Sequence, residues 1–201
     1  MPTRRAVAWT KVDPFGVEFV ELDIDAGYLG ATGVAIGTEP LPYRLDYELA
    51  TGPDHLTTRL YVTCRGEGWR RALDLRRDDA GHWSVGTQDD GDVDLPPVGG
   101  DMATLDDALD CDLELSPVTN MMPILRHGLL QGGGPVDLTM AWVAVPSLAV
   151  HADLQRYRHV RTEDDQHVVR FEARDGSFEA DIVLDRDGVV LDYPEIARRL
   201  R

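Results

Sequence analysis

The sequence predicts an all-β fold, mainly antiparallel, that forms a single domain over residues 1–201. Three observations predict this class. Apolar and polar residues alternate with a period of two, Asp-Gly pairs separate several of these stretches, and only two short segments have a helical pattern. The alternating stretches indicate about eleven or twelve strands. All-β barrels often use about this length as one unit, and no repeat, low-complexity tract or long linker divides the chain.

The first clear strands lie in residues 43–49 and 56–64. In each stretch the apolar residues share one face and the charged residues share the other, which is typical of half-buried antiparallel strands. Hairpin turns are expected at residues 66–68 and 78–81. We expect a surface loop over Gln88–Asp101, which is acidic and contains Gly and Pro, and a strand that is apolar on both faces over Asp137–Val145.

The segment from about residue 166 to 193 is predicted to be a three-stranded meander. Asp175-Gly176 and Asp187-Gly188 are both signals for short hairpin turns. Closing the chain there places apolar residues opposite one another, as a correct register requires. The expected pairs are Ala173–Phe178, Phe171–Ala180, Val169–Ile182, His167–Leu184, Leu184–Leu191 and Ile182–Tyr193.

Two segments have a helical pattern, Thr119–His127 and a short turn at Glu195–Leu200. Ser116-Pro117 turns the chain before the first of these, because the residue before proline avoids the helical region. Thr119 or Asn120 is expected to cap that helix with its side chain. The glycines at residues 132–134 follow the helix and therefore predict a helix stop and a turn, not a phosphate-binding loop.

The charge balance excludes several kinds of partner. The chain has 20 basic and 36 acidic residues, for a net charge of −16. Such a surface repels phosphate backbones and anionic membrane surfaces, so we expect no nucleic-acid partner. No apolar run approaches the roughly 18 residues of a membrane span. We see no signal peptide and expect a cytoplasmic protein in which Cys64 and Cys111 are free thiols.

Motifs for nucleotide, cofactor and metal chemistry are absent from the sequence. There is no Walker loop, no G-x-S-x-G elbow and no dinucleotide-binding fingerprint. The six histidines show no metal-ligand spacing, so we predict no metal site and no cofactor. Asp110 and Asp112 point to one face of a strand with Cα atoms about 7 Å apart, which is compatible with a pair of hydrolytic carboxylates. The alternative is a solvated polar face, or carboxylates bonded to arginine or to backbone N–H groups.

One segment carries a resemblance to a known family. Residues 110–126 read DCDLELSPVTNMMPILR and resemble the signature of the putative glycolipid-binding family, D-x-D-L…S-P-x-T-N-x-x-P-I-R-R. The similarity continues over about residues 5–201, in Gly81-His82-Trp83, in Ala141-Trp142-Val143 with Pro146-Ser147-Leu148, in Gln155-x-Tyr157, in Phe178-Glu179-Ala180 and in residues 185–194. The first arginine of the family signature is Leu125 here, and Arg126 keeps the second.

The resemblance implies a strongly bent antiparallel sheet, a half-open β-barrel similar to bacterial lipoprotein carriers, with a short helix on its concave side. It implies a binding protein for an amphipathic ligand such as a glycolipid, held in an apolar groove. Candidate ligand-binding residues are Asp112, Thr119, Asn120, Arg126 and Gln155 for the head group, and Met121, Met122, Trp142 and Tyr157 for the apolar wall. Plain core packing is the alternative for the apolar residues, and helix capping or a buried ion pair is the alternative for Asn120 and Arg126.

Two other functions stay open at the level of the sequence, and we assign no catalytic residue. One is hydrolysis of a glycoside or ester by Asp110, Asp112 or Asp192, and the other is a protein-interaction module. We further expect Asp112 to be held by hydrogen bonds or by an arginine, with Arg126 as the first candidate, because a buried carboxylate must be paired or neutral. Ligand identity and oligomeric state do not follow from the sequence.

Overall fold

The computed structural model describes residues 3–201, which form one large sheet. Within these residues the sheet has fourteen strands in the order β7-β6-β5-β4-β3-β2-β1-β14-β13-β12-β11-β10-β9-β8. The strands are β1 (Thr3–Lys11), β2 (Gly16–Asp25), β3 (Tyr28–Gly37), β4 (Tyr43–Thr51), β5 (Thr57–Gly66), β6 (Trp69–Arg77), β7 (Trp83–Gly91), β8 (Ala108–Leu113), β9 (Val136–Val143), β10 (Val150–Glu163), β11 (Gln166–Ala173), β12 (Glu179–Leu184), β13 (Val190–Tyr193) and β14 (Ala197–Arg199). Neighbouring strands are antiparallel except β8 and β9, which are parallel.

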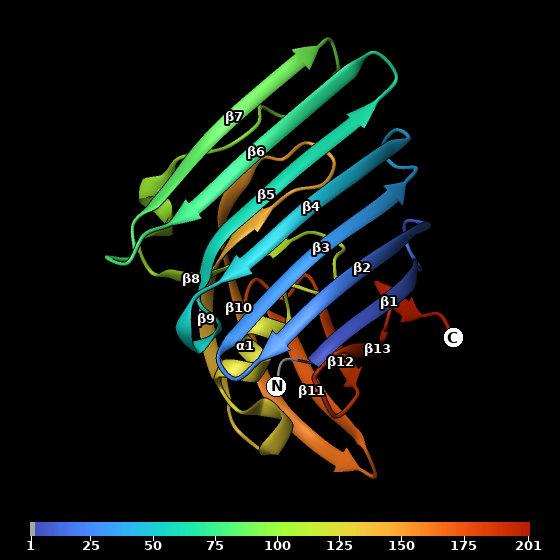
Figure 1. The fold of residues 1–201 in the computed structure, drawn as a ribbon, viewed down its shortest axis with the longest axis vertical. Coiled ribbons are helices and arrows are strands. Elements are labelled where there is room, and N and C mark those ends of the chain that lie inside the picture. The colour runs from blue at the N-terminus through green and yellow to red at the C-terminus, as the bar shows by residue number, and fades with distance from the viewer. Residues whose placement is uncertain (1–2) are drawn as a thin grey trace.

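The sheet bends until its two ends approach each other. Figure 1 shows β1–β7, coloured blue to green, in front of the ochre-to-red strands, with α1 (Met121–Arg126) between the two layers. The Trp83 indole N–H donates to the Ala108 carbonyl at 3.0 Å, and the Cys111 N–H donates to the Thr57 hydroxyl at 3.0 Å. These bonds join β8 to β7 and β5 through side chains, and no backbone ladder pairs β7 with β8 in residues 3–201. The predicted all-β, half-open barrel is therefore confirmed.

The core fills the concave side. The alternating apolar residues of β1–β6 point inward, and Met121, Met122 and Ile124 of α1 are fully buried against them. Two 3₁₀ turns, η1 (Pro53–His55) and η3 (Leu129–Gln131), contact α1, and a third, η2 (Met102–Leu105), contacts β7 and β10. Both cysteines are free and buried, and Gly132 ends η3 in the left-handed conformation (φ 103°), as expected for a helix stop.

The predicted meander is confirmed in its first hairpin; in its second the predicted register holds at Val183–Asp192 and shifts by one residue at the pair nearest the turn. The pairs Phe171–Ala180, Val169–Ile182 and His167–Leu184 are present as expected. Leu184 pairs with Val190, so the expected Leu184–Leu191 pair was wrong. The Asp185 N–H bonds the Val189 carbonyl across a three-residue loop in which Gly188 is left-handed (φ 80°). Such a loop introduces a bulge, and the register shifts between Val183 and Leu184.

Four further expectations need correction. The expected count of about eleven or twelve strands was too low, since the described residues form fourteen. Glu195–Leu200 is not helical, because Ala197–Arg199 pairs with both β1 and β13. The surface loop begins only after Gly91, since Gln88–Gly91 continues β7 against β6. No side-chain hydrogen bond from Asn120 caps α1. The Thr119 hydroxyl does not cap α1 either, because it accepts the Leu113 N–H at 3.2 Å while it donates to Asp112 at 2.7 Å.

Candidate functional site

A groove of about 440 Å³ opens on the concave side between β9–β11, β13 and the turn that leads into α1. One part of its lining is aromatic and another part is rich in carboxyl groups, so we call it the aromatic–carboxylate groove. Its aromatic residues are Trp142, Phe171, Phe178 and Tyr193, its carboxylates are Asp112, Glu114, Asp153 and Asp175, and Asn120, His151, Gln155 and Ser177 complete its polar lining.

The meander brings the aromatic side chains together. Phe171 lies on β11, Phe178 precedes β12, and Tyr193 ends β13. Ring centroids are 5.9 Å apart for Phe171–Phe178 and 6.1 Å apart for Phe178–Tyr193, distances typical of interacting aromatic pairs. Trp142 of β9 lies across from His151 of β10, with centroids 4.6 Å apart. The register of the β9–β13 ladder therefore positions this apolar surface.

Asp112 occupies the inner end of the polar wall and is held by neutral donors. The Thr119 hydroxyl donates to Oδ1 and the Gln155 amide donates to Oδ2, each at 2.7 Å. Burial raises the pKa of Asp112, and the negative charge of Asp153 raises it further. Glu114 accepts the Val145 N–H at 2.6 Å, and burial likewise raises its pKa. The groove thus concentrates carboxyl groups that are poorly solvated.

Two buried side chains at the groove have polar atoms without a partner. Asn120, 3 % exposed, donates its amide to the Tyr157 hydroxyl at 2.8 Å, but its Oδ1 accepts no hydrogen bond within residues 3–201. The hydroxyl of Tyr193, a residue that is 5 % exposed, makes none there either. Neither atom is enclosed by the protein. Among the described residues, Trp69 Nε1 is the one enclosed side-chain nitrogen or oxygen atom that lacks a hydrogen-bond partner. Both atoms are therefore available to a molecule in the groove.

A buried ion pair lies beside the groove. Arg126 donates from its two terminal nitrogens to Asp110, at 2.7 Å and 2.5 Å, and these side chains are 9 % and 0 % exposed. The expectation that Arg126 is the first candidate to hold Asp112 was thus wrong, although Asp112 is held by hydrogen bonds as predicted. Asp192 pairs with Arg198 on the surface. Of the three aspartates considered for hydrolysis, only Asp112 lines the groove.

Comparison with known proteins places the chain in a family. The family described as "Putative glycolipid-binding" matches residues 6–199. The chain belongs to this family. The crystal structure of a DUF1089 family protein from Pseudomonas aeruginosa is 29 % identical, covers 91 % of this chain and 92 % of that one, and has a TM-score of 0.70. A β-barrel-like DUF1849 protein from Brucella abortus is 12 % identical over 100 % and 96 % of the two chains, with a TM-score of 0.46. No curated protein matches.

The residues predicted for the site fall into three groups in this member of the glycolipid-binding family. Asp112, Asn120, Trp142 and Gln155 line the groove. Thr119 and Tyr157 lie behind it and position Asp112, Asn120 and Gln155 by hydrogen bonds. Arg126, with Met121 and Met122, lies elsewhere: the methionines are fully buried in the core and do not form the apolar wall that we expected.

The other ten lining residues were not predicted, and they include Glu114, Asp153, Phe178 and Tyr193. Phe178 and Tyr193 stand in the family motifs F-x-A and Y-P, which are a sequence signal for them. Asp153 and Glu114 carry no comparable signal, because the chain has 36 acidic residues and most of them are on the surface. Only the fold distinguishes these two from the others.

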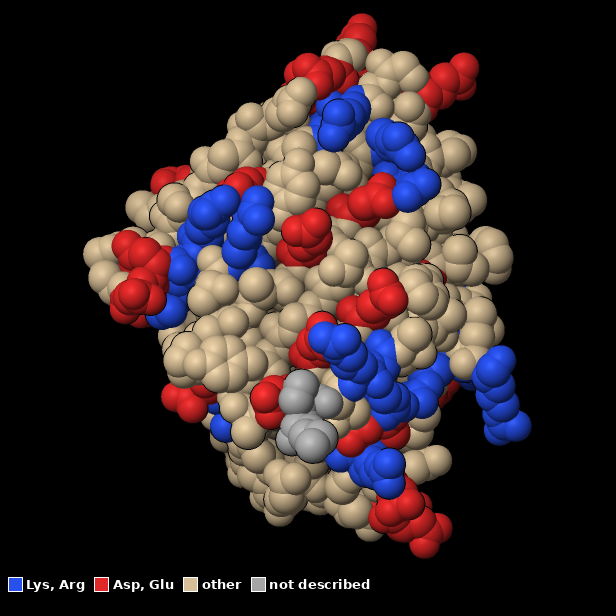
Figure 2. Space-filling view, in the orientation of Figure 1, with Lys and Arg blue, Asp and Glu red and all other residues tan. Residues whose placement is uncertain are grey.

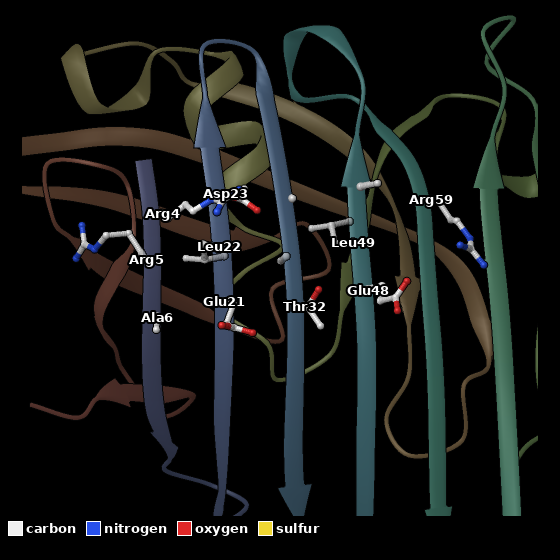
Figure 3. A pocket seen from close by; sticks show the side chains of 13 residues that line it. Arg4, Arg5, Ala6, Glu21, Leu22, Asp23, Thr32, Glu48, Leu49 and Arg59 are labelled. Carbon is white, nitrogen blue, oxygen red and sulfur yellow. The ribbon is translucent and has the colours of Figure 1, made fainter. Parts of the chain in front are cut away.

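A second depression, of about 600 Å³, lies on the convex face of β1–β5 (Figure 3). Its basic groups already have partners, since Arg4 pairs with Asp23 at 2.8 Å and Arg59 pairs with Asp74 at 2.7 Å. Figure 2 shows acidic and basic side chains interspersed over this face. The depression therefore offers fewer unused groups to a ligand than the groove does.

Residues 3–201 contain no cluster of three or more His, Cys, Asp or Glu side chains arranged to hold a metal ion. No helix among these residues is long and apolar enough to cross a membrane.

Proposed function

We propose that this protein binds the sugar head group of an amphipathic, glycolipid-like ligand in the aromatic–carboxylate groove. The observation that carries the proposal is the pair of unused polar atoms, Asn120 Oδ1 and the Tyr193 hydroxyl, on side chains that are almost fully buried at the groove. Neither atom is enclosed, so both are open to the groove, and a ligand hydroxyl placed there gains a hydrogen bond worth about 0.5–1.5 kcal/mol.

The remainder of the lining suits a sugar ring. Such a ring has apolar C–H faces and a polar edge of hydroxyl groups. Trp142 and Phe178 offer flat apolar surfaces for the faces, while Asp153 offers a carboxylate for the edge. A volume of about 440 Å³ fits a small-molecule pocket, and Ile196 gives an apolar route along which an alkyl chain leaves the groove.

The family description supports the same class of ligand, because it names glycolipids. It does not say which part of the molecule holds the ligand. We place recognition of the head group in this groove, because α1 and its fully buried methionines occupy the concavity beside it. The alkyl chain then contributes less to recognition than the sugar does.

The test is a titration with n-octyl β-D-glucopyranoside below its critical micelle concentration, followed by tryptophan fluorescence and calorimetry. We expect a dissociation constant below 1 mM, that is, a free energy below about −4 kcal/mol, and no comparable binding of 1-octanol, which lacks the sugar. Trp142→Phe should remove the fluorescence change, because Trp142 is the one tryptophan among the lining residues.

Tyr193→Phe removes the unused hydroxyl and leaves the aromatic ring. We expect it to weaken binding of octyl glucoside about fivefold or more, since a lost hydrogen bond is worth about 1 kcal/mol. Tyr61→Phe is the matched control, because Tyr61 lies on β5 outside the groove. The proposal fails if octyl glucoside and 1-octanol bind with equal affinity, or if Tyr193→Phe binds octyl glucoside as tightly as the wild type does, because the site then does not recognise the sugar.

A further inference from the structure

The ionisable groups of the aromatic–carboxylate groove have one predominant sign. Four carboxyl groups line it, those of Asp112, Glu114, Asp153 and Asp175, and no lysine or arginine does. His151 is the single imidazole in the lining. An anionic head group placed here would approach several carboxylates with no cation to offset them, in a cleft that is partly shielded from water.

These carboxylates range from buried (Asp112) to exposed (Asp175), and they lack the basic partners that buried and half-buried carboxylates have elsewhere in residues 3–201. Glu18 pairs with Lys11, Asp110 with Arg126, and Asp185 with Arg199. Within residues 3–201, none of the four groove carboxylates forms an ion pair with a basic side chain. The pKa of Glu114 is raised by burial and by the charge of Asp112, which is the expected result of like charges sharing one site. A cation in the groove would relieve this repulsion.

The aromatic wall provides a second and independent indication of a ligand. Tyr193 is 5 % exposed, and its hydroxyl, which has no partner within residues 3–201, is open to the groove beside these carboxylates, so it is free to bond the polar edge of a bound molecule. The ring face of Trp142, in turn, attracts cations through its quadrupole. Aromatic faces combined with unpaired carboxylates are chemically suited to an ammonium group.

We infer that the groove selects by charge, so that it binds head groups bearing a free amino group best, accepts neutral sugars, and excludes phosphorylated, sulfated or carboxylated head groups. The preferred ligand class is an amino-sugar lipid with a protonated amine. This inference rests on the proposed function, because it names the class of head group that the same site takes.

Four octyl glycosides that differ in one substituent test the inference at pH 7 and low ionic strength. They are octyl glucoside (neutral), octyl 2-amino-2-deoxyglucoside (cationic), its N-acetyl derivative (neutral) and octyl glucuronide (anionic). We expect the amino sugar to bind about tenfold more tightly than octyl glucoside, and the glucuronide at least about tenfold more weakly. The N-acetyl derivative should return to the neutral affinity, and added salt should reduce the advantage of the amine.

Two variants locate the effect in the protein. Asp153→Asn and Glu114→Gln each remove one groove charge, and they should lower the ratio of amino-sugar to glucoside affinity about threefold without abolishing glucoside binding. Asp90→Asn is the matched control, because it changes the net charge equally at an exposed residue of β7 that does not line the groove. If the ratio of amino-sugar to glucoside affinity falls equally in all three variants, the preference comes from the overall charge of the protein, and the inference is overturned.

The outcomes distinguish the two proposals. If octyl glucoside binds but the amino sugar binds no more tightly than its N-acetyl derivative, or the glucuronide binds as well as the glucoside, selection by charge is wrong and sugar binding stands. If none of the four glycosides binds to the folded protein, the proposed function itself fails and the charge inference fails with it.

Discussion

Removal of the buried carboxylate of Asp110 should destabilise the protein strongly. Asp110 is fully buried and accepts two hydrogen bonds from Arg126, whose side chain is 9 % exposed. In the Asp110→Ala variant the guanidinium loses its counter-charge but stays in the interior, and breaking a buried pair in this way costs about 3–5 kcal/mol. For a protein of this size, this corresponds to a fall in melting temperature of about 6–20 °C.

Urea unfolding of three variants tests this reasoning. Asp23→Ala is the matched control, because it also removes an aspartate from an arginine, but in the exposed Arg4–Asp23 pair (83 % and 61 % exposed), where we expect a loss of about 0–1 kcal/mol. Replacing both partners, with Asp110→Leu and Arg126→Met together, should recover most of the loss, since no charge then stays buried. A free energy of unfolding for Asp110→Ala within about 1 kcal/mol of wild type would refute the buried-pair argument.

Three further predictions concern other buried groups. Burial raises the pKa of Glu114 in the folded state, so this carboxyl is harder to ionise in the folded protein than in the unfolded one. The stability that the protonated group gives at acid pH is therefore lost as the pH rises through its folded pKa. Glu114→Gln should therefore be more stable than wild type in urea at pH 8 and equal to it at about pH 4, and a constant difference would contradict this. Lys11, the single lysine, is 6 % exposed and paired with Glu18, so peptide mapping after treatment with an amine-reactive ester should find it labelled in urea but not in the native protein. Tyr157→Phe removes the hydroxyl that joins Asn120 to Gln155 and should cost about 1–3 kcal/mol in urea unfolding, against almost nothing for Tyr61→Phe.

The local rules of strand geometry made much of the fold predictable. Side chains alternate across a strand whatever its neighbours are, so the inward faces of residues 43–49 and 56–64 follow from the sequence alone. The hairpin at Asp175-Gly176 was equally local, and its register is confirmed. The same rules were insufficient at Asp187-Gly188, because two loop lengths fit that sequence and they differ by one residue in register.

The sequence also named four of the fourteen residues that line the groove. Asp112, Asn120, Trp142 and Gln155 were found through motifs shared with the family, not through their chemistry. The same motifs included Phe178 and Tyr193, but a motif does not tell whether its aromatic side chain packs in the core or faces a cavity. That choice depends on how β13 packs against β11 and β12.

The tertiary structure alone decided which charged groups meet. Asp110 and Asp112 are two residues apart, yet one pairs with Arg126 and the other with Thr119 and Gln155. Likewise, only the fold separates the unpaired Asp153 and Glu114 from the many surface carboxylates of an acidic chain. The physical reason is the range of the interactions. Alternation along a strand is set by the backbone within a few residues, whereas an ion pair or a hydrogen bond requires two atoms from distant segments to lie within about 3 Å.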